Sequence, residues 1–122
     1  MDFRLTQDQI MLRDTVRRIA LENFAPRAAE IDREEVFPQE NFKILAGNGL
    51  LGTQVPEEYG GAGAGMMALI LTVEEVARVC AGTSVIVTTQ ALASDPLLLA
   101  GSEEQKKSYL YRLASGQCLG AC

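Results

Sequence analysis

The first thirty residues carry apolar side chains at helical spacing. They recur in steps of three and four, as on one face of a helix: Leu12, Val16, Ile19, Ala20 and Phe24. Thr6 and Gln9 have the spacing of a capping box, which predicts that this helix begins just after Thr6. Pro26 lacks an N–H and disfavours helical geometry in the residue before it. We therefore expect a kink or a short break there, with helix resuming through about Asp32.

A second helical pattern starts at Phe37-Pro38 and places Phe42 and Leu45 on one face. Glycines at 47 and 49 end it. Residues 50–65 are rich in glycine and show no helical period. We expect this segment to be an irregular crossing held in place by its neighbours.

A third helix is predicted over residues 66–80. Its buried residues are expected to be Leu69, Ile70, Val73, Val76, Ala77 and Cys80. The charged residues Glu74, Glu75 and Arg78 are expected to face solvent.

The run from Ser84 to Leu99 is ambiguous. Its β-branched residues favour a strand by propensity, whereas its length and its helical neighbours favour a buried helix. We predict a helix.

A second capping box, formed by Ser102 and Gln105, opens the last helix, and Gly116 ends it. Its buried side is expected to hold Tyr109, Leu110 and Leu113, with Lys106 and Lys107 outside. Together these patterns predict one all-α domain over residues 1–122, an orthogonal bundle of about five to six helices.

Composition narrows the function classes. The chain has 122 residues, of which 48% are hydrophobic and 22% are charged, as in an ordinary globular domain. A net charge of -5 without a basic stripe argues against nucleic acid as a partner. No secretory signal and no apolar run of membrane-spanning length occur in it, so we expect a cytoplasmic protein, or an organelle-matrix protein in a eukaryote.

The usual catalytic residues are missing from the sequence. It contains no histidine, and Cys80, Cys118 and Cys122 lack C-x-x-C spacing, so we expect reduced thiols and no metal site. The run Gly61–Gly65 lacks the G-x-G-x-x-G spacing of a dinucleotide loop and is interpreted as a turn. The pairs Glu57-Glu58 and Glu74-Glu75 are interpreted as solvated charges, because adjacent helical residues diverge. We therefore assign no catalytic residue.

Several motifs nevertheless occur in an order and spacing that resemble the amino-terminal helical domain of acyl-CoA dehydrogenases. They cover nearly the whole chain and comprise residues 5–14, 25–33, 37–38, 49–63, 74–78 and 101–116. The most specific among them is Val55-Pro56-Glu57-Glu58-Tyr59-Gly60-Gly61. Each motif alone is weak evidence for the family, but their occurrence together in the same order and spacing is specific to it.

The resemblance implies a reaction and a binding site. Enzymes of this family remove the α-proton of an acyl-CoA with a glutamate and pass a β-hydride to FAD, which yields a trans-2-enoyl-CoA. Part of the apolar tube for the acyl tail would come from the fourth helix, at positions Ser84, Val85, Thr88 and Leu92, with Pro96 breaking that helix further along. These four residues are equally compatible with ordinary helix core. The resemblance leaves the acyl length open.

The resemblance also implies partners. The family's flavin motif and glutamate base lie in a β-domain and a second helical domain that would follow Cys122, so we expect the 122 residues alone neither to retain FAD nor to oxidise acyl-CoA. A homo-oligomer is expected, with an electron-transfer flavoprotein docking near Leu12 and Leu50, unless both leucines are core. The alternatives are a free-standing helical interaction module and a fragment of an acyl-CoA oxidase-like flavoenzyme.

Overall fold

The computed structural model describes residues 1–121, and its regular secondary structure is helical. Within that range it holds no β-strand and six α-helices: α1 (Gln7–Ile19), α2 (Ala28–Glu34), α3 (Gln39–Gly47), α4 (Gly65–Ala77), α5 (Ala81–Ala100) and α6 (Glu103–Ser115). The predicted all-α fold is confirmed, including helix for the ambiguous run 84–99. None of these helices is both long and apolar enough to cross a bilayer.

Both predicted capping boxes are present. The Gln9 N–H donates to Thr6 Oγ1 over 3.2 Å, and the Thr6 N–H donates to Gln9 Oε1 over 2.9 Å. Ser102 and Gln105 repeat these two bonds at the same distances. Each box satisfies backbone N–H groups that have no partner inside the helix, so α1 and α6 begin where the sequence predicts.

The helix breaks at the predicted proline. After α1 the chain forms a π-turn (Ala20–Phe24) and a 3-10 turn (Ala25–Arg27) before α2. α2 ends at Glu35, which has a φ of 52° and turns the chain toward α3.

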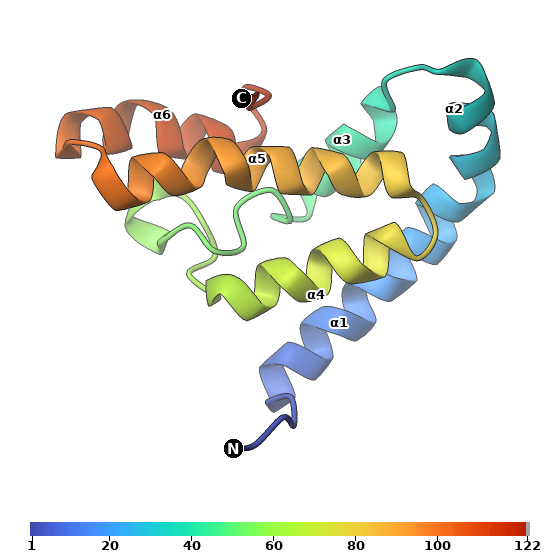
Figure 1. The fold of residues 1–122 in the computed structure, drawn as a ribbon, viewed down its shortest axis with the longest axis horizontal. Helices are drawn as coiled ribbons and strands as arrows, with labels where there is room; N and C mark the ends of the chain where they lie inside the picture. Colours follow the sequence, from blue (N-terminus) through green and yellow to red (C-terminus); the bar gives the residue numbers. More distant parts are fainter. Residues whose placement is uncertain (122) are drawn as a thin grey trace.

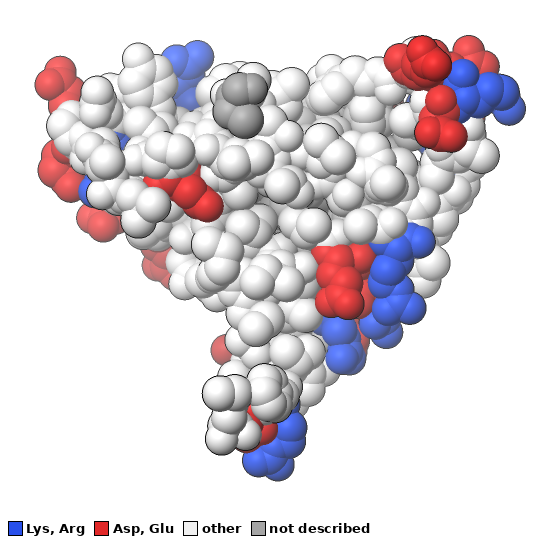
Figure 2. All heavy atoms as spheres, viewed as in Figure 1, with Lys and Arg blue, Asp and Glu red and all other residues white. Residues whose placement is uncertain are grey.

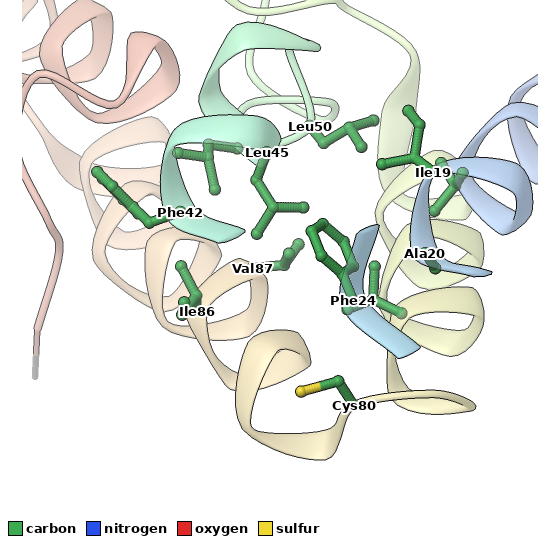
Figure 3. Packing of buried hydrophobic residues seen from close by; sticks show 12 residues of the cluster. Ile19, Ala20, Phe24, Phe42, Leu45, Leu50, Cys80, Ile86 and Val87 are labelled. Carbon is green, nitrogen blue, oxygen red and sulfur yellow. The ribbon is translucent and has the colours of Figure 1, made fainter. Parts of the chain in front are cut away.

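Four helices stack side by side, and α1 packs on α4 although α2 and α3 lie between them in the sequence. α4 lies between α1 and α5, and α5 lies between α4 and α6 (Figure 1). The core forms where α3 and the π-turn meet α4 and α5. Phe24 is fully buried there and points toward Leu45 and Val87 (Figure 3).

The glycine-rich crossing between α3 and α4 is closely packed. A Cβ on Gly52 would lie 2.5 Å from the Ala114 Cβ, so the crossing can approach α6 only without a side chain there. Tyr59 is buried and donates its hydroxyl to Glu103 Oε2 over 2.7 Å. This bond to a carboxylate is the main reason that the pKa of Tyr59 rises to about 12. The crossing is thus fixed to the start of α6.

Pro96 does not break α5, contrary to the sequence prediction. The helix continues to Ala100, and the Gly101 N–H still donates to the Leu97 carbonyl over 2.9 Å. Proline removes one helical hydrogen bond, the one to the carbonyl of Leu92. The loss of this single bond is not enough to end the helix, because the bonds on either side of it can still form.

Some predicted exposures are also wrong. Three residues that were predicted to be buried are exposed. Ile70 and Tyr109 are 50% and 51% exposed and Ala77 is also exposed, because each lies on the outer edge of its helix. Glu75 is only 3% exposed, although it was expected to face solvent. Its carboxylate accepts two bonds from the Arg17 guanidinium, of 2.9 and 2.8 Å, and this pairing is what permits its burial.

Candidate functional site

The exposed side of α5 carries an apolar stripe. Val85 and Leu92 are 59% and 51% exposed, and Thr88 lies exposed between them at helical spacing. Ser84 is only 7% exposed and lies at the inner edge of the stripe. The structure therefore brings three of the four predicted substrate-binding residues to one surface. We call Val85, Thr88 and Leu92 the α5 stripe.

The hydroxyl groups beside the stripe are turned back into the helix. Ser84 Oγ donates to the Ala81 carbonyl over 2.7 Å, Thr88 Oγ1 to the Ser84 carbonyl over 3.1 Å, and Thr89 Oγ1 to the Val85 carbonyl over 2.7 Å. A threonine whose hydroxyl bonds to its own helix presents its methyl group outward. The surface is consequently less polar than its sequence indicates.

Hollows lie on both sides of the stripe. On the α4 side, Thr88 and Ala91 face Leu69, Ile70 and Val73 across a furrow of about 570 Å³. On the α2 side, Val85 borders a second hollow of about 570 Å³ and a smaller one of about 140 Å³. The four predicted residues thus do not share one pocket, and the stripe forms a ridge between hollows.

The stripe itself carries no charge. α5 holds a single charged residue, Asp95, which accepts a bond from Gln54 Nε2 over 3.3 Å. In the view of Figure 2 the middle of the molecule is largely white, and charged side chains gather at the two upper corners, at the lower end and in a group below the right half of the white area. Charged residues do border the hollows: Glu74 lines the furrow on the α4 side, and Asp32 and Glu35 line the larger hollow on the α2 side. The stripe is suited to an apolar group, because none of its own side chains has a charge that would have to be desolvated.

The glycine-rich run cannot hold a phosphate in this conformation. The N–H groups of Gly61, Ala62 and Gly63 donate to the carbonyls of Pro56, Gly52 and Val55 at 2.8 to 3.1 Å. A phosphate-binding loop needs such N–H groups free and pointing at the anion. The interpretation as a turn is therefore confirmed, and we assign no residue here to the diphosphate of a flavin.

The described residues also hold no cluster of three or more potential metal ligands. Cys80 is 5% exposed, and its Sγ lies 3.0 Å from Thr83 Oγ1 within the core, as expected for a core thiol. Cys118 is an unpaired thiol at intermediate exposure. Cys122 lies outside the described residues.

The two predicted docking residues have different surroundings. Leu12 is half-buried on α1 and packs against the core cluster, so part of its side chain reaches the surface. Leu50 belongs to that cluster and is 4% exposed. A partner could touch Leu12 directly, whereas Leu50 could act only from beneath the surface.

Sequence reasoning overlooked Gln90. This glutamine is completely buried on α5, and its side-chain amide bonds to the end of α6 and to the segment that follows. The available signal was a glutamine between apolar neighbours in the middle of a helix that carries almost no charge.

Comparison with known proteins identifies the family. The sequence model described as "Acyl-CoA dehydrogenase, N-terminal domain" matches residues 6–117. The chain belongs to this family. Among curated relatives, the short-chain-specific acyl-CoA dehydrogenase of Clostridium acetobutylicum is 43% identical over 99% of the chain. The acryloyl-CoA reductase (NADH) of Anaerotignum propionicum is 42% identical over 99% of it.

Solved structures of acyl-CoA dehydrogenases have the same fold. Butyryl-CoA dehydrogenase from Megasphaera elsdenii matches 98% of the chain with a TM-score of 0.89 and 30% identity. A glutaryl-CoA dehydrogenase in complex with glutaryl-CoA matches with a TM-score of 0.88 and 35% identity. The chain spans only 32% of the Clostridium acyl-CoA dehydrogenase and 31% of the reductase.

Proposed function

We propose that this chain supplies one wall of the acyl-binding site of an FAD-dependent acyl-CoA dehydrogenase. The reaction removes one hydrogen from each of the α- and β-carbons of an acyl thioester and leaves a trans-2-enoyl-CoA. The single observation that carries the proposal is the uncharged α5 stripe, whose neighbouring hydroxyls bond to the helix itself. Family membership and the named substrates of the related structures support it.

The proposed role of the stripe is to bind the acyl tail and to keep water away from it. An acyl tail against Val85, the Thr88 methyl group and Leu92 removes apolar surface from water on both partners, which is favourable in proportion to the area buried. Keeping water away also strengthens the electrostatic interactions at the reacting carbons. Neither FAD nor the base that takes the α-proton is assigned to this chain, and both belong in our proposal to regions beyond residues 1–122.

The exposed apolar residues indicate that other domains or subunits pack against this chain. Phe3 and Leu99 are 86% and 87% exposed, and Met66 and Ile70 are about half exposed on α4. Such side chains commonly mark surfaces that other domains or subunits cover. We propose that they are covered in a homo-oligomer of the longer enzyme.

A chimera tests the proposed function. Residues 1–122 would replace the matching first third of the Clostridium short-chain-specific dehydrogenase. We expect the purified chimera to retain FAD and to oxidise butyryl-CoA with an artificial dye as acceptor, because the matched part has the same fold. The isolated 122 residues, assayed alongside, should do neither.

Two matched substitutions in the chimera test the stripe. Val85 and Met11 are 59% and 60% exposed on helices, so an aspartate should disturb folding about equally at either position. We expect Val85→Asp to lower kcat/KM with the dye by about tenfold or more, because the carboxylate must lose water against the acyl tail. Met11→Asp should leave it unchanged. Equal rates in the two variants would exclude contact between the stripe and the substrate.

A second prediction concerns an electron-transfer flavoprotein as partner, which we propose docks where Leu12 reaches the surface. In the chimera, Leu12→Asp should slow electron transfer to that flavoprotein by about tenfold while leaving the dye assay nearly intact. Leu50→Ala serves as the control, because a cavity in the core should lower the melting temperature without changing the ratio of the two assays. If Leu12→Asp lowers both assays and the melting temperature together, Leu12 is structural.

A further inference from the structure

Both the nitrogen and the oxygen of the Gln90 side-chain amide form hydrogen bonds to the end of α6 and to the residues after it. Its Nε2 donates to the Leu113 carbonyl over 2.8 Å and to the Cys118 carbonyl over 3.1 Å. Its Oε1 accepts from the Gly120 N–H. The side chain is completely buried, and the bonds to Leu113 and Gly120 are buried with it, whereas the bond to Cys118 is partly buried.

Two of these bonds hold the tail on both sides of one residue. The carbonyl of Cys118 and the N–H of Gly120 flank Leu119, and both bond to the same side-chain amide. The carboxamide of Gln90 thus offers one donor and one acceptor to the backbone of residues 118–120 and fixes this segment against α5.

Two glycines permit this close approach. Gly116 has a φ of 76° and turns the chain back after α6, where the Gln117 N–H donates to the Arg112 carbonyl over 2.9 Å. Gly120 lies so close to α5 that a Cβ there would be 2.6 Å from the Ala93 Cβ. The turn and the contact are independent of Gln90, and they place the tail within reach of its amide.

The tail also borders the α5 stripe. Leu119 is half-exposed, and together with Val85 and Thr89 it lines the hollow of about 140 Å³ on the α2 side of the stripe. The course of the tail therefore sets one side of this hollow.

We propose that Gln90 is a positioning residue that holds residues 118–120 against α5 and thereby places Leu119 beside Val85. The turn at Gly116 brings the tail to α5, and the amide of Gln90 then fixes it there. That Leu119 then contributes to the acyl-binding wall rests on the proposed function, whereas the clamp itself does not.

The clamp is tested in the 122-residue chain without any activity assay. Gln90→Met keeps the length of the side chain and removes all three bonds. We expect amide hydrogen exchange at Gly120, followed by NMR, to accelerate by about tenfold relative to the amides inside α5 and α6. The Leu119 Cα chemical shift should move from its value in the wild type toward that of a random coil.

Ser94→Ala is the matched control. Ser94 is also completely buried on α5, and its Oγ donates to the Gln90 carbonyl over 2.8 Å, so this variant removes a buried side-chain hydrogen bond on the same helix without touching the tail. Gln90→Glu should restore part of the protection, because a carboxylate oxygen still accepts from Gly120. The proposal is overturned if Gly120 exchanges equally fast in wild type and Gln90→Met, or if Ser94→Ala releases it to the same extent.

Discussion

Replacing Gly61 by alanine is expected to lower the free energy of unfolding by about 3 kcal/mol. A Cβ at this position would coincide with the carbonyl group of Val55, which is backbone and cannot rotate away. The Gly61 N–H is also bonded to the Pro56 carbonyl over 3.1 Å, so the crossing cannot shift without losing that bond. Urea unfolding of the two proteins measures the difference.

Gly47→Ala is the control for this substitution. Gly47 is the last residue of α3, and a Cβ there would meet nothing within 4 Å. Alanine has the higher helix propensity, so this variant should be as stable as wild type or up to about 0.5 kcal/mol more stable. Equal urea midpoints for Gly61→Ala and Gly47→Ala would show that the crossing is loosely packed, contrary to the structure.

The parts of the fold that depend on local chemistry could be predicted from the sequence. Capping boxes at Thr6 and Ser102 and the break at Pro26 each act within a few residues, and all three are confirmed. The choice of helix for 84–99 was harder. It required the length of the run to outweigh the strand propensity of its β-branched residues.

The misses at Glu75 and Gln90 concern interactions between distant segments. Glu75 is buried because Arg17, 58 positions away, lies against it, and no pattern around Glu75 indicates that partner. The same holds for Gln90, whose partners lie 23 to 30 positions downstream. The periodicity of apolar residues shows which side chains share a face of a helix. It does not show which segment packs against that face.

The candidate site, too, could be predicted only in part from the sequence. Val85, Thr88 and Leu92 lie at helical spacing in the sequence, and all three are exposed on one side of α5. Helical periodicity alone could not place Ser84 inside or show that the nearby hydroxyls are bonded to helix carbonyls, because that depends on χ1 of each residue.

Replacing Arg17 by methionine is expected to lower the melting temperature by about 10 °C at pH 7. The Glu75 carboxylate would then be buried without its bidentate partner, leaving only the Arg78 guanidinium, 3.8 Å away. Arg4→Met is the control. Arg4 makes an equally short contact of 2.9 Å with Asp2, but both side chains are largely exposed, so its removal should leave the melting temperature unchanged.

The pH dependence separates a lost charge pair from lost packing. In the wild type, the hydrogen bonds from Arg17 hold the pKa of Glu75 below its usual value, although burial acts to raise it. A lowered pKa contributes stability that is fully present above the pKa of the unfolded chain, about 4.3, and is lost as the pH falls through the folded value. In Arg17→Met, burial should instead raise the pKa of Glu75. Protonation at low pH then removes the buried unpaired charge and so reduces the destabilisation of the variant. Melting temperatures from pH 7 to pH 3 should therefore converge, whereas a gap that stays constant would assign the effect to packing by the arginine stem.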